Sequence, residues 1–439
     1  MFKQEAPLEL WGGVECTINR VGENFHDQHA RSGHRERVFT DIQMFAGLGL
    51  ETLRTAVLWE QVDGENSWTS ADRTLQAMGQ FGIRPIVGLL HHGSGPASTN
   101  LLDPAFPEKF ASFALRTAQR YPWVHDYTPI NEPQTTSRFS CLYGHWFPHL
   151  RNMRSYTRAL FHQLKGIVLA MRAIRSVQPE ARLVHTEDGG STFSTRALQS
   201  YREEREHRRW LGMDLLYGSV TRDHPLFAFL LEQGLEEREA LWFAENPCPP
   251  SIVGLNYYVT SDRFLDHRVE LYPPHFRGGD SGLEPLVDVD AVRIRAEGIS
   301  GVGAVLGQAW ERYHLPVAIT EAHLGCEPEQ QICWLAETWR EAQRARQAGV
   351  DVRAVTVWGL LGLYNWSDLC TRDMGVYEPG VFDVSSGSPR PTALVQLVRK
   401  LACGQGVEQM GVCGGGWWNG DSRLTLPSPE EESTLSVQC

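Results

Sequence analysis

Short apolar runs and longer amphipathic stretches alternate along this chain of 439 residues. The apolar runs are rich in Val, Ile, Leu and Thr and do not alternate cleanly with polar residues, as is typical of parallel strands buried on both faces. Eight runs predict strands at 8–14, 50–58, 83–90, 124–130, 181–187, 252–258, 315–320 and 352–358. The amphipathic stretches predict helices at 35–47, 70–81, 103–120, 151–177, 195–217, 301–313, 328–348 and 390–401.

This alternation predicts an α/β fold, a (β/α)8 TIM barrel formed by a single domain over residues 1–401. A doubly wound parallel sheet is the alternative, because a strand count does not prove that the sheet closes. However, no GxGxxG motif follows the first strand and no Walker A motif occurs, so the main signatures of nucleotide-binding sheets are absent. The stretches 218–250 and 259–300 hold many Pro, Gly and charged residues, and we expect them to be loop insertions.

The character of the sequence changes near residue 402. Residues 402–439 are rich in Gly, Ser and Pro and show little periodicity, which predicts a poorly ordered C-terminal tail. Trp417 and Trp418 are the exception and could dock on the barrel. A remnant without function is the simpler interpretation of this pair.

Composition excludes some classes of function. The chain has 41 Lys and Arg against 53 Asp and Glu, a formal net charge of −12, which argues against a nucleic-acid binder. No run of 18 apolar residues occurs, so no membrane span is expected. The N-terminus lacks the apolar core of a signal peptide, and nine scattered cysteines without a CxxC pair indicate reduced thiols and a cytoplasmic location. The content of 14 tryptophans is high and calls for an explanation.

Polar side chains follow nearly every predicted strand. In a (β/α)8 barrel, catalytic residues lie at these carboxyl ends. One such residue alone would be an ordinary loop group, but all the strand ends together favour an active site. The residues are Asn19, Arg54, His91, Asn131 with Glu132, Glu187 with Asp188, Asn256 with Tyr258, Glu321 and Trp358.

Two of these residues, Glu132 and Glu321, directly follow the fourth and the seventh strand. Two carboxyl groups that face each other across a barrel mouth can divide the roles of acid and nucleophile if their surroundings keep one protonated and the other ionised. Glycoside hydrolysis uses such a pair, with a separation of about 5–5.5 Å for retention and about 6.5–9.5 Å for inversion. A structural ion-pair role at the top of the barrel is the alternative.

Seven motifs, in chain order, resemble those of glycoside hydrolase family 1, the β-glucosidase and β-galactosidase family, over roughly residues 8–400. They are WGGVECTINRVG (11–22), LRTAVLW (53–59), LLHHG (89–93), TPINEP (128–133), GLNYY (254–258), VAITEAH (317–323) and VWGLLGLYNW (357–366). The resemblance implies a retaining β-glycosidase with Glu132 as the general acid/base and Glu321 as the nucleophile. It also implies that Arg54 and Tyr258 support the nucleophile and that Asn131 binds the sugar 2-hydroxyl.

Further substrate-binding residues expected from these motifs are Asn19, His91, Asn256, Tyr258, Trp358, Asn365 and Trp366. The chain departs from the family pattern at several of the sugar-binding positions. Asn19 replaces a glutamine, Asn365 replaces a glutamate, and His92 replaces a tryptophan. The expected catalytic pair is intact, so the chemistry is expected to be retained, but the preference for a particular sugar need not be that of a typical β-glucosidase.

Alternatives stay open for several residues and for the function. His91 could be a buried core histidine, and Trp358 and Trp366 could be core aromatics, although tryptophan rings suit the C–H faces of sugars. A transglycosidase and a catalytically weak sugar-binding module are the alternatives to a hydrolase. The sequence does not reveal the oligomeric state.

No metal or cofactor is expected, despite 16 histidines. His91 and His92 are adjacent and would point to opposite sides of a strand. Pro148 would interrupt a helix carrying His145 and His149 on one face, and no HExxH motif occurs. The expected partner is a small-molecule glycoside, with no nucleic acid and no membrane.

Overall fold

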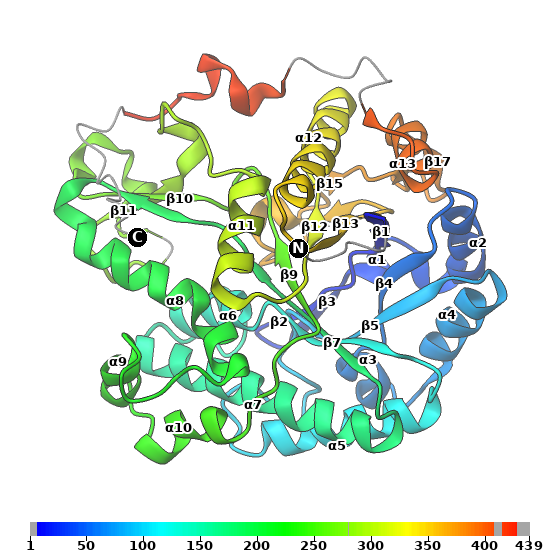
Figure 1. Cartoon of the computed structure of the whole chain (residues 1–439), viewed down its shortest axis with the longest axis horizontal. Helices are drawn as coiled ribbons and strands as arrows, with labels where there is room; N and C mark the ends of the chain where they lie inside the picture. The colour runs from blue at the N-terminus through cyan, green and yellow to red at the C-terminus, as the bar shows by residue number, and fades with distance from the viewer. Residues whose placement is uncertain (1–6, 280, 408–414, 428–439) are drawn as a thin grey trace.

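The computed structural model describes residues 7–279, 281–407 and 415–427. Eight parallel strands close into a barrel in the order β1-β13-β12-β9-β7-β6-β5-β4, with helices around the outside (Figure 1). Closure occurs at β1, where Gly12 pairs with Leu53 of β4 on one side and with Val357 of β13 on the other. The predicted (β/α)8 barrel is therefore confirmed, and the doubly wound sheet is excluded.

The eight barrel strands agree with the eight predicted runs to within a few residues. They are β1 (Glu9–Gly13), β4 (Thr52–Ala56), β5 (Arg84–His91), β6 (Asp126–Asn131), β7 (Arg182–Asp188), β9 (Ile252–Asn256), β12 (Val317–Ala322) and β13 (Val352–Val357). The main helices that follow them are α2 (His34–Ala46), α4 (Thr69–Gln80), α5 (Phe106–Arg120), α7 (Met153–Val177), α8 (Gln199–Tyr217), α11 (Val302–Tyr313), α12 (Pro328–Gln347) and α13 (Leu394–Ala402).

The apolar pattern explains how these helices cover the barrel. In α13, Leu394, Leu397, Val398 and Leu401 recur at the helical spacing, and all four side chains are buried. The strands are buried on both faces, as in β12, where every residue is buried. The core therefore lies partly inside the barrel and partly between the barrel and its helices.

Shorter elements lie between the barrel strands and the main helices in the chain. The helices are α1 (Gln28–Arg31), α3 (Trp59–Gly64), α6 (Pro133–Ser137), α9 (Phe227–Glu232) and α10 (Glu237–Glu245), with a π-turn at Arg138–Leu142. The strands are β2 (Ile18–Val21), β3 (Asn24–Asp27), β8 (Thr192–Ser194), β10 (Arg263–Asp266), β11 (Val287–Asp290), β14 (Leu363–Tyr364), β15 (Tyr377–Glu378), β16 (Phe382–Asp383) and β17 (Arg390–Pro391).

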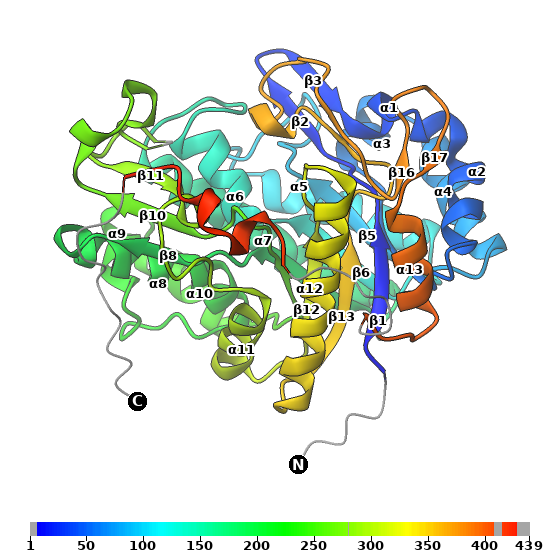
Figure 2. The same cartoon turned by 90° about the horizontal axis from the view of Figure 1, so that it is seen from above.

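The two insertions are more structured than loops. Residues 218–250 form α9 and α10, and residues 259–300 supply β10 and β11, which join β8 in a three-stranded sheet beside α8 (Figure 2). This sheet buries a small apolar cluster of its own, including Phe264, Tyr272 and Val289. Residues 259–300 thus form part of a packed sheet that lines a cavity beside the barrel.

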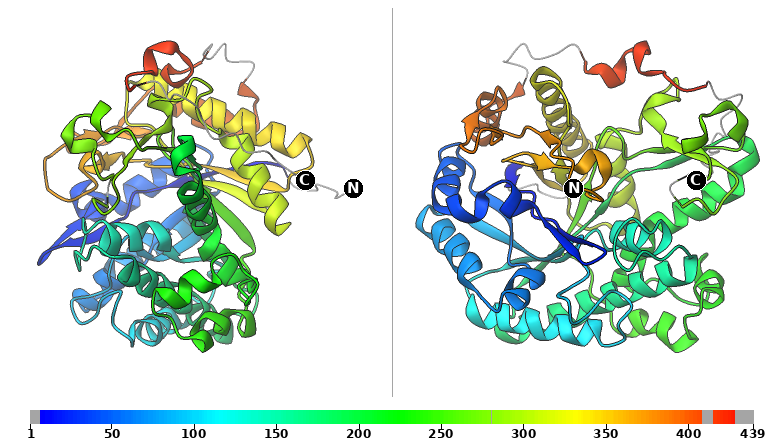
Figure 3. Two further views of the ribbon diagram at one scale, coloured as in Figure 1. Left: turned by 90° about the vertical axis from the view of Figure 1, so that its left-hand side faces the viewer. Right: turned by 180° about the vertical axis from the view of Figure 1, so that it is seen from behind.

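Part of the predicted tail packs on the barrel. Residues 415–427 cross from α12 to the loop after β11 (Figure 3). Trp418 is 1% exposed, its indole N–H lies 3.0 Å from a carboxylate oxygen of Glu337, and its ring meets Trp334 edge-on. Arg423 donates to the carbonyl of Arg295 at 2.7 Å. This pair of tryptophans therefore docks, while residues 408–414 and 428–439 of the predicted tail lie outside the described residues.

The cysteines differ from the expectation at one position. Cys333 is disulfide-bonded, so the prediction of reduced thiols is wrong there. The other described cysteines are free: Cys16, Cys141, Cys248, Cys326, Cys370 and Cys403. The cytoplasmic location stays a prediction. Within the described ranges, none of the helices combines the length and apolarity that a bilayer crossing demands.

Candidate active site

The two predicted carboxyl residues lie at the carboxyl ends of β6 and β12. Glu321 is part of β12, next to Asn256 of β9 in the sheet register. Glu132 directly follows β6 in the left-handed conformation, with φ of 45°, and Pro133 then begins α6. Positive φ is uncommon for a residue with a side chain and is often found at functional sites. The backbone N–H of Glu132 donates to the carbonyl of Thr186 at 3.1 Å, which fixes this turn against β7.

Both oxygens of Glu321 accept hydrogen bonds. Arg54 donates from Nη1 to Oε1 at 2.9 Å, and the Tyr258 hydroxyl donates to Oε2 at 2.5 Å. The same Nη1 also donates to the carbonyl of Thr320, the residue before the carboxylate. A buried carboxylate with a guanidinium and a phenol as donors is held in one orientation, and its ionised form is stabilised.

The Glu132 carboxyl has a different set of neighbours. Asn256 donates from Nδ2 to Oε1 at 2.5 Å, and the Nε2 atom of His92 lies 3.8 Å from Oε2. Burial and the neighbouring Arg54 lower the pKa of His92 to about 3, so this ring is neutral near pH 7. Among the described residues, Glu132 therefore receives one short hydrogen bond from a neutral amide and no ion pair from a cation.

Asn131 lies between the two carboxyl groups. Its Oδ1 atom accepts from Nη2 of Arg54 at 2.9 Å and from Oγ1 of Thr186 at 2.7 Å. Its Nδ2 atom faces the Nε2 atoms of His91 at 3.2 Å and His92 at 3.4 Å. The amide is thereby locked in place and connects the Arg54 side of the site with the histidine side.

The proton affinities of the two carboxyl groups differ in a way that suits a division of roles. Burial raises the pKa of Glu321 to about 7, against the lowering effect of Arg54 and Tyr258. Burial also raises the pKa of Glu132 well above its ordinary value, and the negative charges of Glu321 and Asp188 raise it further. When one proton is shared between the two groups, Glu132 therefore holds it.

One aromatic wall of the site is built from His91 and Trp358. Their rings are parallel, with an interplanar angle of 6° and centroids 5.5 Å apart, and the Arg54 guanidinium lies 4.6 Å from the Trp358 ring centre. Beneath them, Glu15 accepts from the Trp358 indole N–H at 3.1 Å and from the Thr17 backbone at 2.8 Å. Sequence reasoning missed Glu15. Its signal was an acidic residue directly after the first strand, inside the motif of residues 11–22.

A second aromatic wall lies around His92. Trp366 and Trp146 both contact this ring, at centroid distances of 5.4 and 5.3 Å. The indole N–H of Trp146 donates to the carbonyl of Leu369 at 2.7 Å. Sequence reasoning did not select Trp146, because it lies far from any predicted strand end.

The two asparagines that replace family residues are engaged elsewhere. Asn19, on the β2–β3 hairpin, donates to the carbonyl of Cys370 at 3.0 Å. The oxygen of Asn365 accepts from the backbone N–H groups of Met374 and Val376, and its amide donates to Asp373 at 3.1 Å. These contacts shape the loop after β14. Sugar binding by Asn19 and Asn365 stays a prediction.

Glu187 and Asp188 lie at the end of β7, near Glu132. Glu187 accepts from the backbone N–H of Gln134, two residues beyond Glu132, at 2.9 Å. Burial raises the pKa of Glu187 to about 7. Glu187 therefore fixes the start of α6, and the negative charges of both residues raise the pKa of Glu132. Throughout residues 7–279, 281–407 and 415–427, no group of three or more His, Cys, Asp or Glu is arranged to hold a metal ion.

Comparisons with known proteins find similar sequences and similar structures. No family model matches the chain. Beta-glucosidase A of Thermotoga maritima is 22% identical over 409 residues, covering 84% of this chain and 87% of the relative. Phospho-cellobiase of Klebsiella oxytoca is 21% identical over 370 residues, covering 74% of this chain and 75% of the relative. A solved family 1 β-glucosidase of Thermotoga maritima superimposes with a TM-score of 0.72 at 18% identity, covering 91% and 98% of the two chains. The resemblance is confirmed at this level: the chain is a divergent relative of the family 1 glycoside hydrolases.

Proposed function

We propose that this divergent relative is a glycoside hydrolase that cleaves β-linked glycosides with retention, through a covalent glycosyl-enzyme intermediate. The observation that carries the proposal is the unequal treatment of two buried carboxyl groups at one barrel mouth. Glu321 has a guanidinium and a phenol on its two oxygens, whereas Glu132 has only a neutral amide. Names of relatives, including β-glucosidase A, phospho-cellobiase and a β-galactosidase of Saccharolobus solfataricus, agree with it.

In this mechanism the ionised carboxylate of Glu321 attacks the anomeric carbon while Glu132 protonates the leaving oxygen. The carbon–oxygen bond to the leaving group breaks as the bond to Glu321 forms. Glu132, now ionised, takes a proton from water as that water attacks the anomeric carbon and releases Glu321. Arg54 and Tyr258 hold Glu321 ionised and aimed throughout.

The remaining residues take binding roles in this proposal. Asn131 bonds the 2-hydroxyl, and Asn256 positions the acid/base carboxyl. The His91–Trp358 wall and Trp366 offer faces to the sugar ring. Solved complexes of the Thermotoga maritima β-glucosidase with cyclophellitol and with deoxynojirimycin support a small sugar-like ligand. In the proposed scheme no metal or cofactor takes part, and the location is cytoplasmic.

The test is a panel of nitrophenyl glycosides with gluco, galacto, fuco, manno and xylo glycones in both anomeric forms. We expect turnover of at least one β-glycoside and of no α-glycoside. The first-formed sugar, followed by proton NMR, should be the β-anomer. Release of the α-anomer first would contradict retention, and an inert panel would contradict hydrolysis. Product analysis with an added sugar acceptor separates hydrolysis from transglycosylation.

A further inference from the structure

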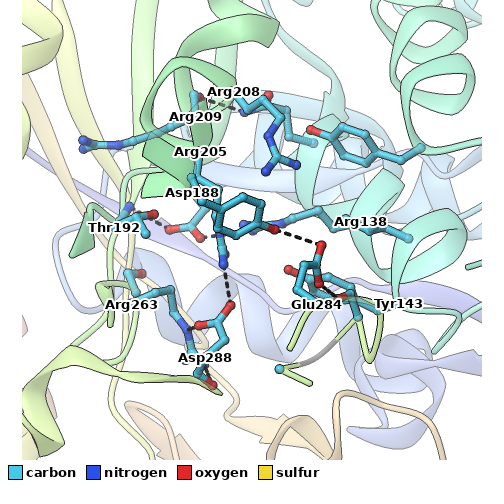
Figure 4. Close-up of a pocket in the computed structure, with 18 of the residues that line it drawn as sticks. Arg138, Tyr143, Asp188, Thr192, Arg205, Arg208, Arg209, Arg263, Glu284 and Asp288 are labelled. Atoms are coloured by element: carbon cyan, nitrogen blue, oxygen red, sulfur yellow. Dashed lines mark hydrogen bonds and ion pairs between the residues drawn. The ribbon is translucent and has the colours of Figure 1, made fainter. Parts of the chain in front are cut away.

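A polar cavity is lined by residues that follow β6 and β9 and by the last residues of β7. Figure 4 shows its charged side chains. Its charged lining comes from the end of β7, the π-turn after α6, helix α8 and the inserted β10–β11 sheet. The cavity is distinctive for its guanidinium groups, and we call it the arginine pocket. Its five arginines are Arg138, Arg205, Arg208, Arg209 and Arg263.

Two lining residues connect the arginine pocket to the catalytic residues, Gln134 through the chain and Ser261 through a hydrogen bond. Gln134 lines the pocket and bonds Glu187 through its backbone N–H, two residues after Glu132. Ser261 lines it too, and its hydroxyl accepts from the backbone N–H of Tyr258 at 3.0 Å. In the proposed reaction the acid protonates the leaving oxygen, so the leaving group departs on the side of Glu132. The pocket is therefore placed to receive that part of the substrate.

The pocket is lined by four acids against five arginines, and Arg209 pairs with Glu206, outside the lining, at 3.2 Å. Asp288 is shared, because Arg205 donates to one of its oxygens at 2.7 Å and Arg263 to the other at 2.8 Å, and Arg263 also pairs with Asp290. Glu284 accepts from two hydroxyls, those of Tyr201 and Ser281, and it forms no ion pair with any described residue.

At the β7 end of the pocket, too, the acids only partly neutralise the arginines. Asp188 reaches Arg138 at 3.3 Å. Glu187, the fourth acid of the lining, faces the backbone of Gln134 and the hydroxyl of Thr135.

Arg208 is the least neutralised of the five guanidinium groups. Its side chain is 9% exposed. It contacts the thioether of Met153 at 3.6 Å, the half-exposed Glu204 at 3.3 Å, and the ring centres of Tyr201 and Phe229 at 5.8 and 6.0 Å. Its Nη2 atom is buried with no hydrogen-bond partner in the described part of the chain, and the same holds for Nε of Arg138. Buried donors without partners cost free energy, and a guanidinium fork matches the two oxygens of a carboxylate or a phosphate.

We propose that the arginine pocket binds an anionic group, a carboxylate or a phosphate monoester, carried by the leaving-group part of the substrate. The inference rests on the proposed glycosidase function and adds the chemical class of the leaving group. An anion would satisfy the donors of α8, whereas an apolar leaving group would cover them and leave them unpaired. The acids of β7 stand nearest Glu132, so the anionic group is expected on the α8 side of the pocket.

The test uses three aryl β-glycosides that share the glycone preferred in the nitrophenyl panel. Their leaving groups are 4-carboxyphenol, its neutral analogue 4-carbamoylphenol, and 4-phosphonooxyphenol. We expect kcat/KM for one or both anionic substrates to exceed that for the amide by about 10- to 100-fold, as for a hydrogen bond to a charged partner. The carboxylate and phosphate arms distinguish which anion the pocket takes.

The variants separate binding of the anion from folding. Arg208→Gln should reduce the preference for the anion to less than about threefold and leave the amide substrate within about twofold. Arg208→Lys should keep part of the preference, since the charge stays but the planar fork is lost. Arg222→Gln is the matched control, because that side chain is 70% exposed and pairs with Glu237 away from the pocket. Equal loss on all three substrates in Arg208→Gln would mean a structural role and would overturn the proposal.

Failure of the pocket and failure of the glycosidase function give different results. If the amide substrate is hydrolysed and the anions gain nothing, the pocket proposal is wrong and the function stands. If no glycoside is hydrolysed, the function is wrong, and the pocket is tested by calorimetric titration with 4-hydroxybenzoate and with inorganic phosphate. Saturable binding that Arg208→Gln removes and Arg222→Gln keeps would support an anion site. Absence of saturable binding to the wild-type protein would overturn it.

Discussion

The two carboxyl groups at the barrel mouth have the same chemistry and opposite surroundings. Glu321 accepts from a cation and a phenol, one on each oxygen. Glu132 accepts from an amide, and the charges of Asp188 and Glu187 add to the effect of its own burial. Because burial raises the pKa of both carboxyl groups, the donors and charges around them decide which one ionises first.

The largest expected effect comes from deleting either carboxyl group. Glu321→Gly and Glu132→Gly should each lower kcat by roughly 10⁴-fold or more. Azide should rescue both variants but with different products, because it enters from opposite faces of the sugar. Glu321→Gly should yield the α-glycosyl azide, and Glu132→Gly, with an activated leaving group, the β-glycosyl azide, identified by NMR.

The control for this pair is Glu232→Gly, on the exposed surface of α9. It should retain wild-type kcat. Identical azide products from the two catalytic variants would mean that the two carboxyl groups do not have distinct roles.

A smaller effect is expected from removing one donor of Glu321. Tyr258→Phe keeps the ring and deletes the hydroxyl that bonds Oε2. We expect kcat/KM to fall by about 10²- to 10³-fold, as when a single preorganised donor is lost. Steady-state kinetics on a nitrophenyl β-glycoside measures it, and a fall smaller than about threefold would argue that Arg54 alone orients the nucleophile.

The pH profile tests the difference in proton affinity directly. The proposed mechanism needs Glu321 ionised and Glu132 protonated. The value of kcat/KM should therefore fall as pH drops below the pKa of Glu321, about 7, and also as pH rises above the raised pKa of Glu132. Glu15 raises the pKa of Glu321 by its charge. Glu15→Gln should therefore move the acid limb to lower pH. The amide can still accept from Trp358, so the plateau should stay within about threefold of wild type.

If the acid limb of the kcat/KM profile stays at the same pH in Glu15→Gln, then the buried Glu15 carries no charge near Glu321. Glu15→Ala separates the two roles, because it also removes the acceptor of the Trp358 indole. Glu15→Ala should raise KM and also move the acid limb to lower pH, since Trp358 loses the hydrogen bond that holds its ring.

The smallest effect on activity is expected from a substitution far in the sequence from Glu132 and Glu321, where residues 415–427 contact α12. Trp418→Ala should lower the free energy of unfolding by about 3 kcal/mol, because a buried indole is lost. Urea unfolding measures it, with kcat unchanged. Trp123→Ala is the control, since that side chain is 44% exposed. A loss of kcat in Trp418→Ala would link the tail to the site.

The barrel could be predicted from the sequence because its strands are continuous apolar runs buried on both faces. Glu132 and Glu321 could be chosen because each follows such a run directly. The contact of Glu15 with Trp358 joins residues 343 positions apart, and no local pattern encodes it. The same is true of the arginine pocket, whose lining runs from residue 134 to residue 288.

Asn365 shows that the position of a residue in a motif does not by itself establish what the residue does. The motif placed it at a sugar-binding position, yet both polar atoms of its side chain bond the loop that follows it. A short amide next to free backbone N–H groups satisfies them locally. That competition depends on the loop conformation, which the motif does not specify.

The most direct test of the two-carboxyl account is to trap the intermediate. An activated 2-deoxy-2-fluoro β-glycoside of the preferred glycone should inactivate the protein and add one fluoroglycosyl unit to its intact mass. Peptide mapping by tandem mass spectrometry should then locate the label on Glu321. A label on Glu132, or glycoside turnover in which no covalent adduct can be trapped, would contradict the assignment of Glu321 as the nucleophile and Glu132 as the acid.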